Sequence, residues 1–139
     1  MATQIQQAER FLALHSGPDP LLLPNPWDVG SAKLFASLGF AALATTSSGF
    51  AATLGRLDGK VTRDEALAHA AAIVRATHLP VTADLENGYA DSPADVAETI
   101  VLAAEAGLAG CSVEDSPAGR TTRSTRRRWP RNASPRRPR

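Results

Sequence analysis

The chain has 139 residues, 43% of them hydrophobic, which is enough for the core of one domain. Its single cysteine, Cys111, excludes an intrachain disulfide and a cysteine-based zinc site. No apolar run approaches the roughly 20 residues of a membrane span, and the N-terminus lacks the features of a secretory signal, so we expect a cytoplasmic protein without membrane contact.

The net charge of +1 is the sum of two oppositely charged segments. Residues 1–119 contain six basic and fourteen acidic side chains, a net charge of −8. Residues 120–139 contain nine arginines and no acidic residue, a net charge of +9. Because a change this sharp marks a boundary, we predict an ordered domain at residues 1–118 and a disordered Arg/Pro-rich tail at residues 119–139.

Helical and strand-like patterns alternate along the predicted domain. Residues 3–15 carry apolar side chains at helical spacing and are expected to form an amphipathic helix, which the following Gly17-Pro18 pair terminates. Four short strands are expected after this helix, at residues 21–23, at 41–45, from Val81 onward and at 110–113. Three further helices are expected. One spans residues 30–38, the second follows a capping box at Thr62–Glu65, and the third begins at Ser92-Pro93. The expected buried stripe of the third helix is Val96, Ile100 and Ala103.

Strands that alternate with helices indicate a parallel sheet, either open and doubly wound or closed into a barrel. The first strand is not followed by Gly-x-Gly-x-x-Gly, which leaves a dinucleotide-binding fold with little support. We therefore predict an α/β fold consisting of the first four βα units of a partial (β/α)₈ TIM barrel. A complete barrel needs roughly 250 residues, and this chain supplies about half of one.

Polar residues follow three of the expected strands. They are Thr46, Ser47 and Ser48, then Asp84 and Glu86, then Glu114 and Asp115, with Asp58 in the loop after the first group. Asp84 and Glu86 are spaced i, i+2 and so point to one face of a strand, where water, a cation or hydrogen-bond donors must compensate their charge. Several oxygen ligands at one mouth suit Mg²⁺, and a small Ser/Thr loop offers backbone N–H groups to a carboxylate. A solvated strand end explains the two carboxylates equally well.

Five segments, taken in order and spacing, resemble the isocitrate lyase / phosphoenolpyruvate mutase superfamily over about residues 20–115. The segments are residues 25–32 (Asn-Pro-Trp-Asp-Val-Gly-Ser-Ala), 44–50, 54–59, 83–89 and 111–115. The resemblance is to small bacterial lyase/mutase-like proteins rather than to true isocitrate lyases. It implies a Mg²⁺-dependent enzyme that makes or breaks a bond next to a 2-oxo or enolpyruvyl group of a small carboxylate substrate.

The resemblance also implies roles for the polar residues. Asp84 matches the direct metal ligand of the family, whereas Asp58, Glu86 and Glu114 match carboxylates that hold the metal mostly through water. Glu86 stands where the family usually has aspartate. The metal would act as a Lewis acid that stabilises an enolate. The substrate carboxylate would bind in the loop of Thr46, Ser47 and Ser48.

The sequence departs from the family pattern after Asp115. Relatives carry a catalytic loop there, such as the Lys-Arg-Cys-Gly-His loop of the lyases, followed by four more βα units, and neither is recognisable in this chain. Codons for residues 121–125, read one base earlier, permit Asp-Asp-Pro-Ile-Tyr, so we interpret the tail as a frameshift product and the chain as truncated. Family members are homo-oligomers, and the sequence leaves the assembly of this chain open.

Two alternatives to an active enzyme follow from the tail. One is a catalytically inactive fragment, and the other is an α/β module with an Arg-rich tail that binds nucleic acid. Clustered arginines bind phosphate electrostatically. Natural basic arms usually mix lysine with arginine beside a complete domain, and this tail contains no lysine. We therefore expect incidental polyanion binding rather than an evolved nucleic-acid partner.

Overall fold

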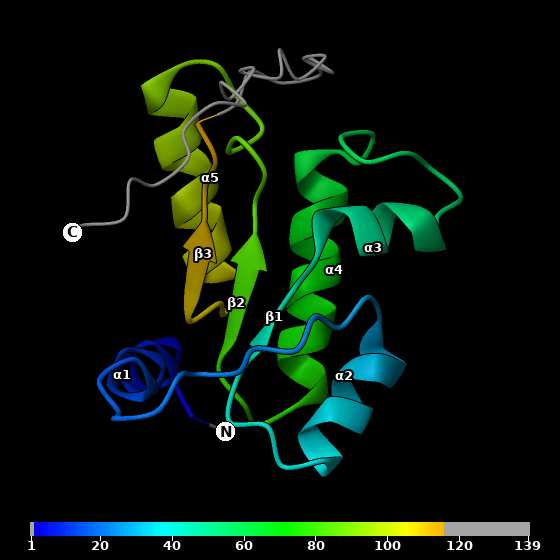
Figure 1. Ribbon diagram of the computed structural model, residues 1–139. Coiled ribbons are helices and arrows are strands. Elements are labelled where there is room, and N and C mark those ends of the chain that lie inside the picture. The colour runs from blue at the N-terminus through cyan, green and yellow to red at the C-terminus, as the bar shows by residue number, and fades with distance from the viewer. Residues whose placement is uncertain (1, 116–139) are drawn as a thin grey trace, which may run out of the picture.

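The computed structural model describes residues 2–115, so the tail and the frameshift expected for residues 119–139 lie outside the described residues. Within this range, three parallel strands form one sheet in the order β1-β2-β3 (Figure 1). The strands are β1 (Leu43–Ala44), β2 (Val81–Asp84) and β3 (Gly110–Ser112). The helices are α1 (Gln4–Leu14), α2 (Val29–Ser37), α3 (Ser47–Thr53), α4 (Arg63–Ala76) and α5 (Pro93–Glu105).

The helices α4 and α5 cover one face of the sheet. α4 packs on β2 and against α2 and α5, and α5 packs on β3. Along β2, Val81 and Ala83 are buried toward these helices, whereas the alternate residues Thr82 and Asp84 are only half-buried. The core between sheet and helices is made of small and branched apolar side chains, among them Leu43, Leu67, Ala70, Ile73, Leu85 and Ala103.

α1 lies across the starting ends of β2 and β3. Its Gln7 and Arg10 side chains donate to the carbonyl of His78 (3.0 and 3.4 Å), just before β2, and Gln4 donates to the carbonyl of Leu108 (2.9 Å), just before β3. At the opposite ends of the strands lie the loops after β2 and β3 and the start of α3. No helix within residues 2–115 is long and apolar enough to cross a membrane.

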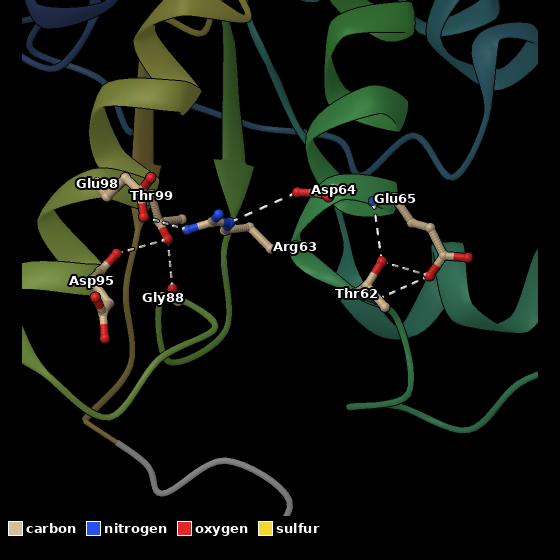
Figure 2. Close-up of polar contacts among 8 residues, drawn as sticks. All are labelled: Thr62, Arg63, Asp64, Glu65, Gly88, Asp95, Glu98 and Thr99. Atoms are coloured by element: carbon tan, nitrogen blue, oxygen red, sulfur yellow. Dashed lines mark hydrogen bonds and ion pairs between the residues drawn. The ribbon is translucent and has the colours of Figure 1, made fainter.

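The helices expected from the sequence are confirmed within one or two residues, because their end signals are local. The Thr62 hydroxyl accepts the Glu65 N–H (3.3 Å), and the Glu65 carboxylate accepts the Thr62 N–H (2.9 Å), which completes the expected capping box (Figure 2). The Ser92 hydroxyl likewise accepts the Asp95 N–H (3.2 Å) at the start of α5. Burial in α5 differs from the prediction, since Thr99 and Ala103 are buried and Ile100 is exposed.

The strand expected at residues 21–23 is wrong. The chain is irregular there, and Leu22 is 71% exposed. In the described part of the chain, the following residues bond to β1 only at Ala44, whose N–H donates to the carbonyl of Pro24 (3.1 Å) and whose carbonyl accepts from the Asn25 side chain (3.0 Å). Proline has no N–H to donate, so Pro24 and Pro26 prevent this segment from extending a ladder along β1. The described residues therefore contain three strands where four were expected.

Candidate functional site

The candidate site lies where β2 ends and α3 begins. Asp84, the last residue of β2, accepts hydrogen bonds at Oδ2 from the Ser47 N–H (3.1 Å) and the Ser47 hydroxyl (2.7 Å). Its Oδ1 accepts the N–H of Glu86 (3.1 Å). The side chain is thus held by donors from two segments, which is one of the forms of compensation expected for a carboxylate at this position.

The loop expected at Thr46, Ser47 and Ser48 is instead the start of α3. Thr46 is the N-cap, and its hydroxyl accepts the N–H of Gly49 (3.2 Å). The prediction missed this helix because serine and glycine are weak helix formers, whereas the cap and the Asp84 carboxylate beside the first turn stabilise it. The Ser47 N–H is paired with Asp84, and a substrate-binding role for the three residues stays a prediction.

Glu86 lies beyond the strand. Its φ of +49° turns the chain out of β2, so the alternation that was expected to place Asp84 and Glu86 on one face does not extend to Glu86. Its Oε1 atom is buried and, within the described residues, has no hydrogen-bond partner. Burial raises the pKa of the Glu86 carboxyl, the neighbouring carboxylates Asp58, Asp84 and Glu114 raise it further, and the Tyr89 phenol beside it opposes this by lowering it. The three other acidic residues predicted from the sequence therefore each lie within electrostatic reach of Glu86.

The two outer carboxylates of this group are exposed. Asp58 lies in the loop before α4, and a methyl group added at the adjacent Gly59 would stand 3.8 Å from Oε2 of Glu86. Glu114 follows β3, and its N–H donates to the Glu86 carbonyl (2.6 Å). Within residues 2–115, no three His, Cys, Asp or Glu side chains stand in a geometry that would hold a metal ion directly. The acidic group is thus an open cluster rather than a closed cage.

Tyr89 belongs to the site and was not expected from the sequence. It has a positive φ of +57°, and burial followed by the Glu86 and Asp84 carboxylates raises the pKa of its phenol well above its usual range. A phenol that keeps its proton is a hydrogen-bond donor beside the acidic cluster. The signal that points to it is the preceding Asn87-Gly88 pair, which predicts a turn with positive φ.

A groove of about 510 Å³ runs along the face of the sheet that α4 and α5 leave uncovered. All three strands contribute to it, through Ala44, Thr82 and Ser112 among others, and Asp84 and Glu114 line it as well. Phe11 of α1 also lines this groove. A concave surface with a few polar groups makes this groove a candidate small-molecule site.

Replacing Gly88 with alanine is expected to destabilise the fold more than replacing Gly55 does. Both glycines have positive φ (+79° and +67°), so each alanine costs about 1–2 kcal/mol of backbone strain. At Gly88 the new methyl group would also lie 2.8 Å from Cγ1 of Val96, whereas nothing lies within 4 Å at Gly55. This overpacking adds about 1–3 kcal/mol. Urea denaturation measures the difference, and equal losses would contradict the close contact between this turn and α5.

Comparison with known proteins defines the class. The family model of phosphoenolpyruvate phosphomutase matches residues 11–133. This covers most of the chain and continues past the boundary expected at residue 118. The chain belongs to the isocitrate lyase / phosphoenolpyruvate mutase superfamily.

Several individual members of this superfamily are similar to most of this chain. An uncharacterised protein of Mycobacterium tuberculosis is 39% identical over 78% of this chain and 41% of its own length. A 2-methylisocitrate lyase of Halalkalibacterium halodurans is 33% identical over 81% of this chain and 38% of its own. The crystal structure of a protein described provisionally as a lyase/mutase, from Burkholderia cenocepacia J2315, superposes with a TM-score of 0.81 at 53% identity, over 84% of this chain and 42% of that one. The chain spans about two fifths of the length of these relatives.

Proposed function

We propose that this chain carries the metal- and substrate-binding end of a Mg²⁺-dependent lyase or mutase that acts on a bond next to a 2-oxo or enolpyruvyl carboxylate. The observation that carries the proposal is the Glu86 carboxylate. One of its oxygens is buried without a partner in the described residues, and the carboxylates of Asp58, Asp84 and Glu114 each lie within electrostatic reach of it. In a member of this superfamily, a divalent cation is the natural compensation for such a cluster.

The arrangement of the sheet supports successive units of a partial TIM barrel. The strands follow one another in chain order, and α4 and α5 lie on one face. A doubly wound sheet carries helices on both faces. In the proposed barrel the uncovered face is the inner one, the groove is part of the barrel interior, and the site stands at the carboxyl ends of the strands, where barrel enzymes have their active sites.

The donor set fits Mg²⁺. This ion keeps several of its waters and takes one or two carboxylates directly, so an open cluster of four suits it better than a closed cage would. Asp84 would bind it directly, and Asp58, Glu86 and Glu114 would hold it mostly through water. When bound, the ion would supply Lewis-acid stabilisation of an enolate.

The residues of the chain itself would orient the reactants. Ser47 holds the Asp84 carboxylate through two hydrogen bonds, which sets the direction in which this side chain faces the groove. The start of α3, with Thr46 and Ser48 on either side of Ser47, would bind the substrate carboxylate at the rim of the groove. The buried phenol of Tyr89 would keep its proton and donate to a carboxylate in the cluster.

The class of reaction is supported by the relative from Halalkalibacterium halodurans, whose name describes cleavage of a branched tricarboxylate. The test is release of pyruvate or glyoxylate from a panel of small di- and tricarboxylates, with Mg²⁺ and with EDTA. We expect the chain to bind Mg²⁺ and any release of product to require this ion. A folded sample that binds Mg²⁺ and releases neither product would favour the inactive fragment, and one that does not bind Mg²⁺ would overturn the proposed site.

A further inference from the structure

The turn at residues 85–89 determines where the Glu86 side chain lies. The backbone conformation of this turn is strained, so the turn is not stable by itself. Glu86 and Tyr89 both have positive φ (+49° and +57°), which residues with a side chain adopt only at a cost of about 1–2 kcal/mol each. Gly88 between them also has a positive φ (+79°). A turn with this much strain persists only where its surroundings fix it, so the contacts that anchor it decide where Glu86 stands.

Thr99 of α5 is such an anchor. Its side chain is fully buried, and its hydroxyl lies 2.8 Å from the carbonyl oxygen of Gly88, to which it donates (Figure 2). The same hydroxyl lies 3.2 Å from the carbonyl of Asp95, one turn earlier in α5. That carbonyl is inside the helix, where an i+4 N–H is its regular donor. No other donor to the Gly88 carbonyl occurs within residues 2–115, so removal of the hydroxyl would leave a buried acceptor unpaired.

Two further contacts hold α5 against its neighbours. Val96, three residues before Thr99 and hence on the same helix face, packs against Gly88 so closely that an added methyl group there would be 2.8 Å away. Arg63 at the start of α4 forms an ion pair with Glu98 of α5 (3.0 Å), next to Thr99 (Figure 2). Both side chains are partly exposed, so the pair adds little stability. It nevertheless joins the two helices beside the anchor.

We propose that Thr99 is a positioning residue of the metal site: its hydroxyl holds the turn at residues 85–89 through the Gly88 carbonyl and thereby fixes the Glu86 carboxylate within the acidic cluster. This inference rests on the proposed function. Thr99 touches neither the ion nor the substrate in this account and acts only through the backbone. The sequence contains a weak signal for it, a threonine within the otherwise apolar stripe of α5.

The test compares T99V and T99S in the full chain. Valine keeps the shape and removes the hydroxyl, and serine keeps the hydroxyl. We expect T99V to weaken Mg²⁺ binding, measured by calorimetry with Mg²⁺ alone, by about tenfold, the lower end of the effect of residues that orient ligands. The Gly88 N–H donates to the Leu85 carbonyl (2.7 Å). When both proteins are measured in the absence of Mg²⁺, this N–H should exchange with solvent about tenfold faster in T99V than in the wild type. T99S should retain both properties.

A103G separates anchoring from general loss of stability. Ala103 is buried in the same helix, and glycine there destabilises α5 without changing the Thr99 hydroxyl. We expect A103G to lower stability while its Mg²⁺ affinity and Gly88 exchange stay near those of the wild type. The proposal would be overturned if T99V kept the Mg²⁺ affinity and the Gly88 exchange rate of the wild type. It would also be overturned if A103G lost Mg²⁺ affinity and Gly88 protection to the same extent as T99V. If the wild type does not bind Mg²⁺, the proposed function fails, and Gly88 exchange still tests the anchor separately.

Discussion

Replacing Asp84 with asparagine is expected to weaken Mg²⁺ binding by more than about 100-fold while the chain stays folded. Residues that merely orient metal ligands account for about 10–100-fold in affinity, and the proposed direct ligand should exceed this range. Asparagine has nearly the same shape and still accepts a hydrogen bond, but its amide group would face donors from Ser47 or Glu86. The loss should therefore appear in binding, measured by calorimetry, and in any Mg²⁺-dependent product release.

D64N provides the matched control for this variant. Asp64 is an exposed carboxylate in the first turn of α4, and its ion pair is a long contact with Arg63 (3.8 Å). The same loss of charge away from the cluster should leave Mg²⁺ affinity unchanged. Parallel losses in D64N and D84N would show that general electrostatic attraction, rather than a ligand at the end of β2, accounts for the binding.

Replacing Leu85 with alanine is expected to lower the free energy of unfolding by about 3 kcal/mol. Leu85 is 1% exposed and packs in the core between the sheet and α4 and α5. Truncation of a buried leucine removes its transfer free energy and leaves a cavity, at a cost of about 2–5 kcal/mol. A small domain has about 5–15 kcal/mol in total, so the transition midpoint in urea should fall markedly.

L57A is the matched control for the core variant. Leu57 is 78% exposed in the loop before α4, and the same truncation there should change stability by less than about 0.5 kcal/mol. If L57A costs as much as L85A, the loop packs against something other than the described core. If L85A costs little, the end of β2 is not the buried element that the site requires.

The acidic cluster shows how far local patterns lead to a site. The four carboxylates were identified from strand ends and family resemblance, and the structure places them within electrostatic reach of Glu86. The detail of their placement was not foreseen. The strand rule failed at Glu86 because the chain leaves β2 after Asp84 and takes a positive φ, and the expected loop at Thr46–Ser48 became a capped helix.

Elements with local end signals were determined by the sequence itself. The capping box of Thr62 and Glu65 and the serine cap at Ser92 each depend on residues three positions apart, so they form wherever the helix forms. Family membership, too, was readable from the order of short segments between residues 20 and 115. Only the tertiary structure decided which segments pair and what anchors the turns. The strand expected at residues 21–23 is irregular, and Thr99 contacts Gly88 across eleven residues of chain, because strand pairing and buried hydroxyl contacts depend on partners that no local pattern specifies.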